Sequence, residues 1–297
     1  MKFGAIDIGT NAARLLIGEI LTNDKGAQFI KKISYTRIPL RLGVDVFDKG
    51  KIKAKKQVEF TKTIKAFKLI SELFEVTSLR ACATSAMREA ENGIEIQKHI
   101  LKETGVTIEI IDGEEEANLI FSTFFLLDFD YSKPLVVVDV GGGSTEITIF
   151  KNSKIVSAKS FRIGTIRLLK GKVKDNIWDK INEWISSNTD KNTVYQVFGT
   201  GGNINKIHKL FDKLYMKPIC LNELSELLKR IEPLSIKQRI KKYNLKQDRA
   251  DVIVPALTIY TKILAQLQAN EIYAPKIGLS DGIIYDLYQK EKQTKTQ

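Results

Sequence analysis

Two short turns in this sequence each follow an apolar run that ends in an aspartate. The first aspartate is Asp7, in FGAIDIGTNAARLLI, and the second is Asp139, in PLVVVDVGGGSTEITIF. Apolar runs on both sides of a glycine turn are typical of a β-hairpin. Because glycine permits positive φ and carries no Cβ, the backbone N–H groups of such a turn can close around an anion such as phosphate. The aspartate could hold Mg²⁺ beside that anion, although an ordinary hairpin with incidental acids explains the second turn equally well when taken alone.

The elements that follow each turn come in the same order, which indicates an internal repeat. Each turn is followed by further strands and then by helices and strands in alternation, the pattern of an α/β fold. A repeat of this kind predicts two similar lobes whose turns face one cleft. The 297 residues suit two domains, which we place at 1–128 and 129–297. The last helix, about 281–291, is expected to pack back on the first lobe.

Hydrophobic periodicity gives the extent of the individual elements. Strands are predicted at 3–8, 15–21, 28–40, 78–83, 106–111, 135–138, 147–150, 154–161, 193–198 and 271–273. Helices are predicted at 53–74, 94–104, 113–127, 176–186, 221–231 and 248–267, with others that begin near 165, 204 and 281.

The composition excludes some classes of site and partner. With 47 Lys and Arg against 35 Asp and Glu, the net charge of +12 predicts attraction to polyanions without naming one. Two cysteines offer no disulfide framework, and two histidines are too few for a zinc site, so a metal would have oxygen ligands. We find no signal-peptide core at the N-terminus and no apolar run of the ~20 residues that a membrane span needs. We therefore expect a cytoplasmic protein that does not bind membranes.

Six segments together resemble the motifs of one family, the exopolyphosphatase and guanosine pentaphosphatase (Ppx/GppA) family. In order, they are DIGTNAARLL (7–16), ATSAMREAENG (83–93), IDGEEEANLI (111–120), DVGGGSTE (139–146), GTGGNI (199–204) and LSDGIIYDL (279–287). The resemblance implies an actin-like, ribonuclease H-like duplicated fold with a central cleft. It also implies a hydrolase that releases terminal phosphate from inorganic polyphosphate or guanosine pentaphosphate (pppGpp) by Mg²⁺-assisted water attack, with Mn²⁺ as the other candidate metal. The 297 residues contain no counterpart of the extra helical region of longer members, so we expect a short, two-domain member.

The resemblance also assigns roles to the acids. It makes Glu116 the general base, whereas the residues alone equally suit three acids in the first turn of a helix that Asp112 opens. The two interpretations are compatible if only Glu116 points at substrate. Glu146 is expected to bind metal or orient the water, and Asp7 and Asp139 to bind the metal through water.

Phosphate contacts are predicted in four segments. Arg88 and Asn92 are expected to bind phosphate from the first lobe, with a helix-surface ion pair as the alternative. The segment 199–203 precedes a predicted helix and would form a second anion site. The remaining predicted contacts lie in the two turns, and the full set is Gly9, Thr10, Asn11, Arg88, Asn92, Gly141, Gly142, Gly143, Ser144, Thr145, Gly199, Thr200, Gly201 and Gly202. Ala12 departs from the family, which commonly has serine there, so the first turn lacks one hydroxyl.

Two rival functions stay open at this point. An ATP-dependent kinase or ATPase of the same fold would need an adenosine pocket, and the GEEEA segment at 113–117 is foreign to those enzymes. A non-catalytic protein that binds polyphosphate or an alarmone would explain the charge but not the two turns and their acids. Nucleic acid is disfavoured because the acids would repel its backbone. Helices after Asp248 have no assigned role and could pair in a homodimer.

Overall fold

The structure, a computed structural model, describes residues 1–127, 132–152, 154–190 and 192–296 and consists of two compact units. The first unit comprises Met1–Asp128 and Ile277–Gln297, and the second comprises Phe129–Lys276. The second lobe predicted at 129–297 therefore ends about twenty residues earlier, because the last helix packs against the sheet of the first unit. The boundary that we predicted between residues 128 and 129 lies outside the described residues.

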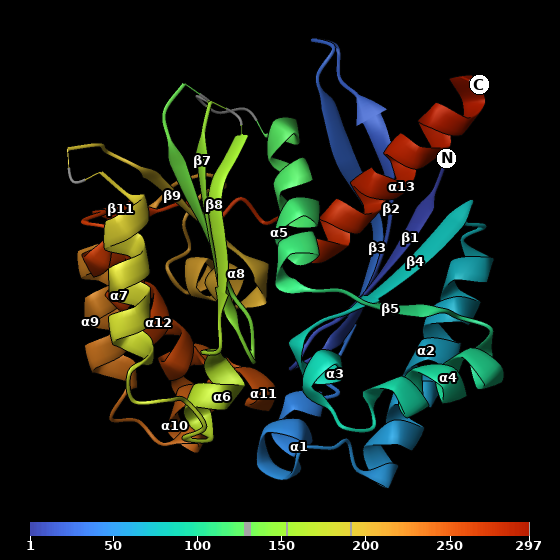
Figure 1. Ribbon diagram of the computed structural model, residues 1–297, viewed down its shortest axis with the longest axis horizontal. Coiled ribbons are helices and arrows are strands. Elements are labelled where there is room, and N and C mark those ends of the chain that lie inside the picture. Colours follow the sequence, from blue (N-terminus) through green and yellow to red (C-terminus); the bar gives the residue numbers. More distant parts are fainter. Residues whose placement is uncertain (128–131, 153, 191, 297) are drawn as a thin grey trace. The chain divides into compact units, whose positions relative to one another are not determined.

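The first unit is built on a five-stranded sheet (Figure 1). Its order is β3 (Gln28–Ile38), β2 (Ala13–Thr22), β1 (Phe3–Ile8), β4 (Ser78–Ala83) and β5 (Ile108–Ile110). The pairs β1–β2 and β2–β3 are antiparallel, whereas β4 runs parallel to both β1 and β5. Every residue of β1 is buried, as expected of a central strand that is covered on both faces.

Two neighbouring residues of β1 identify the helices on each face of this sheet. The Phe3 ring meets Tyr288 of α13 (Leu279–Thr296), with centroids 6.4 Å apart. A Cβ atom on Gly4 would lie 3.6 Å from Ser71 Oγ of α2 (Ala54–Leu73). Because successive residues of a strand point to opposite faces, α13 and α2 cover opposite faces of the sheet. In Figure 1 the red α13 lies on the blue strands of this unit.

The other helices of the first unit connect or extend these layers. They are α1 (Leu42–Lys49), α3 (Ser85–Glu89), α4 (Gly93–Thr104), α5 (Gly113–Ser122) and a 3₁₀ turn at Phe124–Leu126. Helix α4 packs on α2, and α5 packs on α13. Along the part of the chain that the structure describes, no helix has the length and apolar content that a bilayer span needs.

The second unit repeats the core of the first. Its four-stranded sheet has the order β8 (Lys154–Phe161), β7 (Thr145–Lys151), β6 (Leu135–Val140) and β9 (Gln196–Thr200). The pairs β6–β7 and β7–β8 are antiparallel and β6–β9 is parallel, which is also the pattern of β1, β2, β3 and β4. The duplication predicted from the sequence is therefore confirmed.

Helices and one small strand pair complete the second unit. The aliphatic side chains of β6 and β7 form one core with α12, and the ring of Tyr260 lies buried within it. The remaining elements are α6 (Thr165–Leu169), α7 (Ile177–Asn188), α8 (Gly201–Leu210), α9 (Leu221–Ile231), α10 (Ile236–Tyr243), α11 (Gln247–Ala250), α12 (Ile253–Gln266), β10 (Ile219–Cys220) and β11 (Glu271–Ile272).

Two predicted helices differ from the structure for local chemical reasons. The helix predicted over 248–267 is split into α11 and α12, because the ring of Pro255 would clash with the carbonyl four residues earlier in a continuous helix. The helix predicted to reach Leu127 ends as α-helix at Ser122, where the hydroxyls of Ser122 and Thr123 bind carbonyls three residues back. The short helices α1, α3 and α10 were not predicted, and α10 buries no residue that could produce a hydrophobic period.

Candidate active site

The second-unit turn places two carboxylates opposite each other. In the β6–β7 pairing Asp139 lies directly opposite Glu146, and in the β6–β9 pairing it lies opposite Thr200. Residues Gly141 to Ser144 join β6 to β7, and the Gly141 N–H donates to the Ser144 carbonyl at 3.0 Å. Directly opposed residues of antiparallel strands have Cβ atoms about 5 Å apart. The pairing therefore gathers two acids beside one glycine turn.

The first three carbonyl groups of this turn are bound by the start of α6. The N–H groups of residues 165–167 and the Nε of Arg167 donate to the carbonyls of residues 141–143, at 2.7 to 3.1 Å. The N–H and C=O of a planar trans peptide point in opposite directions. The N–H groups of residues 142–144 therefore point away from α6. Three backbone N–H donors that all point away from α6 suit an anion.

Gly164 makes this contact possible. A Cβ atom there would lie 2.5 Å from the carbonyl carbon of Gly142 and 2.6 Å from the nitrogen of Gly143, so any side chain would push the turn away. Thr145, which we predicted to bind phosphate, donates its hydroxyl to the Ile163 carbonyl at 2.6 Å. The sequence carries one signal for the packing of α6 against the turn, which is a glycine directly before the predicted helix start at 165.

The two carboxylates have different surroundings. Glu146 is buried and accepts a hydrogen bond from Ser160 Oγ on β8 at 2.7 Å. Asp139 is half-buried, and its Oδ1 lies 2.7 Å from the place where a Cβ of Gly201 would be. Gly201 has φ +82°, a conformation that favours glycine. Because glycine has no Cβ, the first residue of α8 can lie beside the Asp139 carboxylate.

A divalent cation fits this acid pair. Directly opposed like charges are destabilising, and a cation between Asp139 and Glu146 would remove the repulsion. Within the described residues, no group of three or more His, Cys, Asp or Glu side chains is arranged to hold a metal. Mg²⁺ usually binds through one or two carboxylates and keeps several water molecules. Two carboxylates are therefore a sufficient protein donor set for Mg²⁺, whereas a fully protein-coordinated ion would need more.

The segment 199–203 differs from its prediction as a loop before a helix. Strand β9 extends to Thr200 and α8 begins at once, so Gly201 and Gly202 form the first turn of the helix. The helix can start there because Gly201 adopts positive φ. The helix N-terminus still exposes backbone N–H groups, as an anion site requires.

Three further contacts fix the start of α8. The side-chain amide of Asn203 donates to the Val140 carbonyl at 2.7 Å, and the Tyr260 hydroxyl donates to the Thr200 carbonyl at 3.3 Å. A Cβ atom on Gly199 would lie 2.8 Å from Ile204 Cγ1, so this glycine serves packing. Burial raises the pKa of Tyr260, which keeps its hydroxyl protonated as a donor. These residues position the strand ends that carry the acid pair.

The first-unit turn has the same construction. Residues Gly9 to Ala12 join β1 to β2, and the Gly9 N–H donates to the Ala12 carbonyl at 3.1 Å. The N–H groups of Gly43 and Arg41, at the start of α1, donate to the carbonyls of residues 10 and 11 at 3.0 Å each. The N–H groups of residues 11 and 12 therefore point away from α1. The backbone of this turn, predicted to bind phosphate, presents its donors as the second-unit turn does.

The side chains around the first-unit turn are different. Asp7 is buried and lies opposite Arg14, whose Nη1 donates to Asp7 Oδ2 at 2.6 Å. The hydroxyls of Thr10 and Ser85 are 2.8 Å apart and hydrogen-bonded. Asp7 therefore already has a cation in contact, whereas the acid at the equivalent position of the second unit faces another acid.

Glu116 lies in the first turn of α5, as predicted. Asp112 caps this helix by accepting from the Glu115 N–H at 2.8 Å, and the Glu116 N–H donates to the Asp112 carbonyl at 3.1 Å. The side chain of Glu116 is half-buried, that of Glu114 is exposed, and Glu115 forms an ion pair with Arg80 at 2.7 Å. The three consecutive glutamates thus have three different environments.

The other two predicted contacts of the first unit mainly bind backbone. Arg88 donates from Nη1 to the Ile111 carbonyl, one residue before the cap of α5. Asn92 accepts from the Ile52 N–H at 3.0 Å and donates to the Ile52 carbonyl at 2.9 Å. Asn92 therefore ties α4 to the segment before α2. Arg88 thus contacts the chain just before α5, the helix that carries Glu116, and among the described residues only its Nη1 is seen to donate a side-chain hydrogen bond.

A family model, the Ppx/GppA phosphatase family, matches residues 21–291. The chain belongs to this family. The resemblance seen in the sequence is therefore confirmed over most of the chain. The matched residues include Arg88, Glu116, Asp139 and Glu146, and the first-unit turn precedes them.

Individual Ppx/GppA relatives match different shares of the chain. The bifunctional 3-dehydroquinate synthase/phosphatase of Fusobacterium nucleatum is 28% identical over 285 residues, which cover 88% of this chain and 42% of that protein. Exopolyphosphatase 1 of Mycobacterium tuberculosis is 29% identical over 176 residues, 59% of this chain and 50% of that protein. The chain thus spans half the length or less of these two relatives. The solved Ppx/GppA family member of Aquifex aeolicus is 24% identical with a TM-score of 0.78, covering 98% of both chains, and this likeness confirms the actin-like fold.

Proposed function

We propose that this protein is a phosphoanhydride hydrolase that releases terminal phosphate from inorganic polyphosphate. The observation that carries the proposal is the opposed acid pair, Asp139 and Glu146, beside three N–H groups that point away from α6. Anion donors and a cation site at one turn suit a phosphate with its metal. The Ppx/GppA family match and the exopolyphosphatase among the relatives support the reaction class.

The second-unit turn would bind the phosphoryl group. The N–H groups of residues 142–144 would donate to its oxygens, and such preorganised donors stabilise the charge of the transition state. Asp139 and Glu146 would hold Mg²⁺ or Mn²⁺, which when bound supplies positive charge to the phosphate oxygens. Asp7 is left out of this proposed ligand set because Arg14 already binds its carboxylate.

Glu116 is the proposed proton acceptor for the attacking water. A carboxylate in the first turn of a helix is favoured in its ionised form by the helix dipole, and a base must be ionised to accept a proton. Arg88 is proposed to bind phosphate through Nε and Nη2 while Nη1 holds the Ile111 carbonyl. Asn92 is left out because both ends of its amide bind Ile52.

The substrate choice rests on charge. A net charge of +12 favours a long polyanion, because each phosphate of the chain can interact with a different cation. Polyphosphate is therefore our first choice and pppGpp the second. A cytoplasmic location and a homodimer remain predictions.

The decisive experiment is a phosphate-release assay with polyphosphate of several lengths, pppGpp and ATP, each with and without Mg²⁺. We expect Mg²⁺-dependent release from polyphosphate and none from ATP. Release from ATP alone would favour an ATPase or kinase and overturn the proposal. Binding of polyphosphate that does not need Mg²⁺, without any release, would favour the non-catalytic alternative.

A variant at Glu116 tests the proposed base in the same assay. Glu116→Gln keeps the size of the side chain and removes its ability to accept a proton, so we expect release to fall by roughly 10²- to 10⁴-fold. Substrate binding and thermal stability should stay near those of the wild type. Glu114→Gln is the matched control, since Glu114 belongs to the same helix turn and is exposed. An active Glu116→Gln enzyme would contradict the assignment.

A further inference from the structure

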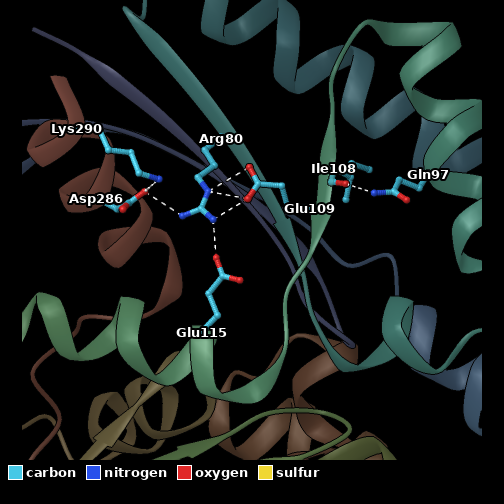
Figure 2. Close-up of polar contacts among 7 residues, drawn as sticks. All are labelled: Arg80, Gln97, Ile108, Glu109, Glu115, Asp286 and Lys290. Atoms are coloured by element: carbon cyan, nitrogen blue, oxygen red, sulfur yellow. Dashed lines mark hydrogen bonds and ion pairs between the residues drawn. The ribbon is translucent and has the colours of Figure 1, made fainter. Parts of the chain in front are cut away.

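A cluster of five charged residues lies between the sheet of the first unit and two of its helices (Figure 2). Its centre is Arg80 on β4, whose side chain is only 10% exposed. Glu109 follows from β5, Glu115 from the first turn of α5, and Asp286 and Lys290 from α13. We call these five residues the Arg80 cluster. Its members come from four elements, so its contacts link the sheet to both helices.

All three nitrogens of the Arg80 guanidinium donate within the cluster. Nη2 donates to Glu109 at 2.6 Å and to Glu115 at 2.7 Å, Nε donates to Glu109 at 3.0 Å, and Nη1 donates to Asp286 at 2.9 Å. Lys290 adds an ion pair with Asp286 at 2.8 Å. An arginine fork can serve several carboxylates in fixed directions, which a lysine cannot.

The charges of the cluster depend on Arg80. Three carboxylates and two cations give −3 + 2 = −1. The hydrogen bond to Glu109 raises the pKa of Arg80, so the guanidinium stays charged. Without it, acids from β5, α5 and α13 would face one another with Lys290 as the remaining cation of the cluster.

Helix α5 is held at several points along its length. Arg88 binds the carbonyl just before its cap, and Asp112 caps its first turn. Further along, a Cβ atom on Gly282 of α13 would lie 2.1 Å from the Leu119 carbonyl oxygen, so α13 seats directly on the α5 backbone. Arg80 adds the contact to Glu115. The first turn is thus fixed by its cap, by α3 and by the guanidinium.

The contact to Glu115 bears on the residue that follows it. Successive residues of an α-helix are rotated by about 100° around its axis. Holding the Glu115 side chain therefore restrains the rotation of the first turn, and with it the position of Glu116. A small rotation of α5 would displace the Glu116 carboxylate without unfolding anything.

We propose that Arg80 is a positioning residue that sets the direction of Glu116 by holding Glu115. The proposal rests on the function proposed above, in which Glu116 accepts the proton. Arg80 does not touch substrate in this account. In a purely stabilising ion cluster, all the contacts of Arg80 would serve stability alone. Here the contact to Glu115 controls turnover, whereas the contacts to Glu109 and Asp286 serve stability.

The cluster contains a matched pair of test residues. Glu109 and Glu115 bind the same Nη2 at 2.6 and 2.7 Å, and both side chains are 45% exposed. Glu115→Gln and Glu109→Gln each remove one negative charge that contacts Arg80. Of the two residues, only Glu115 lies on α5. We expect Glu115→Gln to lower kcat about tenfold with KM within about twofold, because misplacement of a catalytic group costs rate rather than binding. Glu109→Gln should leave kcat within about twofold.

Arg80 itself gives the second arm. Arg80→Gln should lower kcat with KM little changed, and the double variant Arg80→Gln/Glu115→Gln should lose no more kcat than Arg80→Gln alone, since both changes break the same contact. Arg80→Lys should recover part of kcat because it keeps the charge near Glu115. Equal kcat in Glu115→Gln and Glu109→Gln, or additive losses in the double variant, would overturn the proposal. If Arg80→Gln fails to fold, the matched pair of glutamates decides alone.

Amide hydrogen exchange separates this proposal from the proposed function. Exchange in a fragment over residues 112–120 should be faster in Glu115→Gln than in Glu109→Gln, whether or not the protein hydrolyses polyphosphate. A wild-type protein that releases no phosphate from any substrate, with this exchange difference present, would overturn the proposed function while supporting the hold of Arg80 on α5. Equal exchange in the two variants would overturn the positioning role.

Discussion

The first-unit turn at Gly9–Ala12 and the second-unit turn at Gly141–Ser144 connect equivalent strands of two equivalent sheets. Both close with a hydrogen bond from their first N–H to their last carbonyl, and in both the inner carbonyls are bound by the start of the next short helix. The residue directly opposite the strand-end aspartate is Arg14 in the first unit and Glu146 in the second. Asp7 therefore faces a cation, and Asp139 faces an acid.

This difference bears on where we expect a cation to bind. The pair of Asp7 and Arg14 is an ion pair within the protein, with a contact of 2.6 Å. Opposed acids gain stability only when a cation or proton reduces their repulsion. The acid of the first unit is thus in contact with Arg14, and we expect a cation to bind at the acid pair of the second unit. The duplication supplied two copies of one scaffold, and the residue opposite the strand-end aspartate differs in charge between them.

Breaking the ion pair of the first unit should have the largest effect on stability. Arg14→Gln would leave the buried Asp7 carboxylate without its cation, and removal of one partner of a buried pair costs about 3 kcal/mol or more of unfolding free energy. Glu146→Gln, at the equivalent position, should cost far less, since the amide oxygen can still accept from Ser160 Oγ. Urea denaturation of both variants measures the contrast.

The double variant Asp7→Asn/Arg14→Gln is the control for that comparison. It removes both charges, so most of the lost unfolding free energy should return. If Arg14→Gln and Glu146→Gln destabilise the protein equally, the Asp7–Arg14 ion pair has no special weight in stability and the comparison fails.

Disturbing the support of the second turn should have a smaller, functional effect. The new Cβ of Gly164→Ala would meet backbone atoms of the turn at 2.5 to 2.6 Å, and a displacement of the donors by about 1 Å can cost roughly 10²-fold in rate. Gly43→Ala is the matched change in the first unit, where the Cβ would meet the Thr10 methyl at 2.1 Å rather than the turn backbone. We expect a smaller loss of phosphate release there, and equal losses would mean that both turns bind the phosphoryl group alike.

The sequence predicted the features of this comparison that depend on neighbouring residues. Both hairpins were found, and the strands at 78–83 and 154–161 have the predicted bounds, because alternating apolar residues and glycine turns are local signals. The acid at the end of each strand was found for the same reason. The role of Arg14 was not, since it becomes visible only when the register sets it opposite Asp7.

Sequence patterns did not predict contacts between residues that are distant in the chain. Arg80 and Asp286 are 206 positions apart, and no periodicity relates them. Asn92 was predicted to bind phosphate because a motif contains it, whereas its amide binds the backbone of Ile52. The structure adds the contacts of these motif residues within the protein, which the motifs alone do not show.

The most direct test of this account is the binding of Mg²⁺ measured by isothermal titration in the presence of inorganic phosphate, with the wild type, Asp139→Asn, Glu146→Gln and Asp7→Asn. If the opposed acids of the second unit hold the cation, Asp139→Asn and Glu146→Gln should lose the binding signal. Asp7→Asn should keep it, because the Asp7 carboxylate is bound by Arg14. Loss of Mg²⁺ binding in Asp7→Asn, with binding retained in Asp139→Asn and Glu146→Gln, would contradict the account.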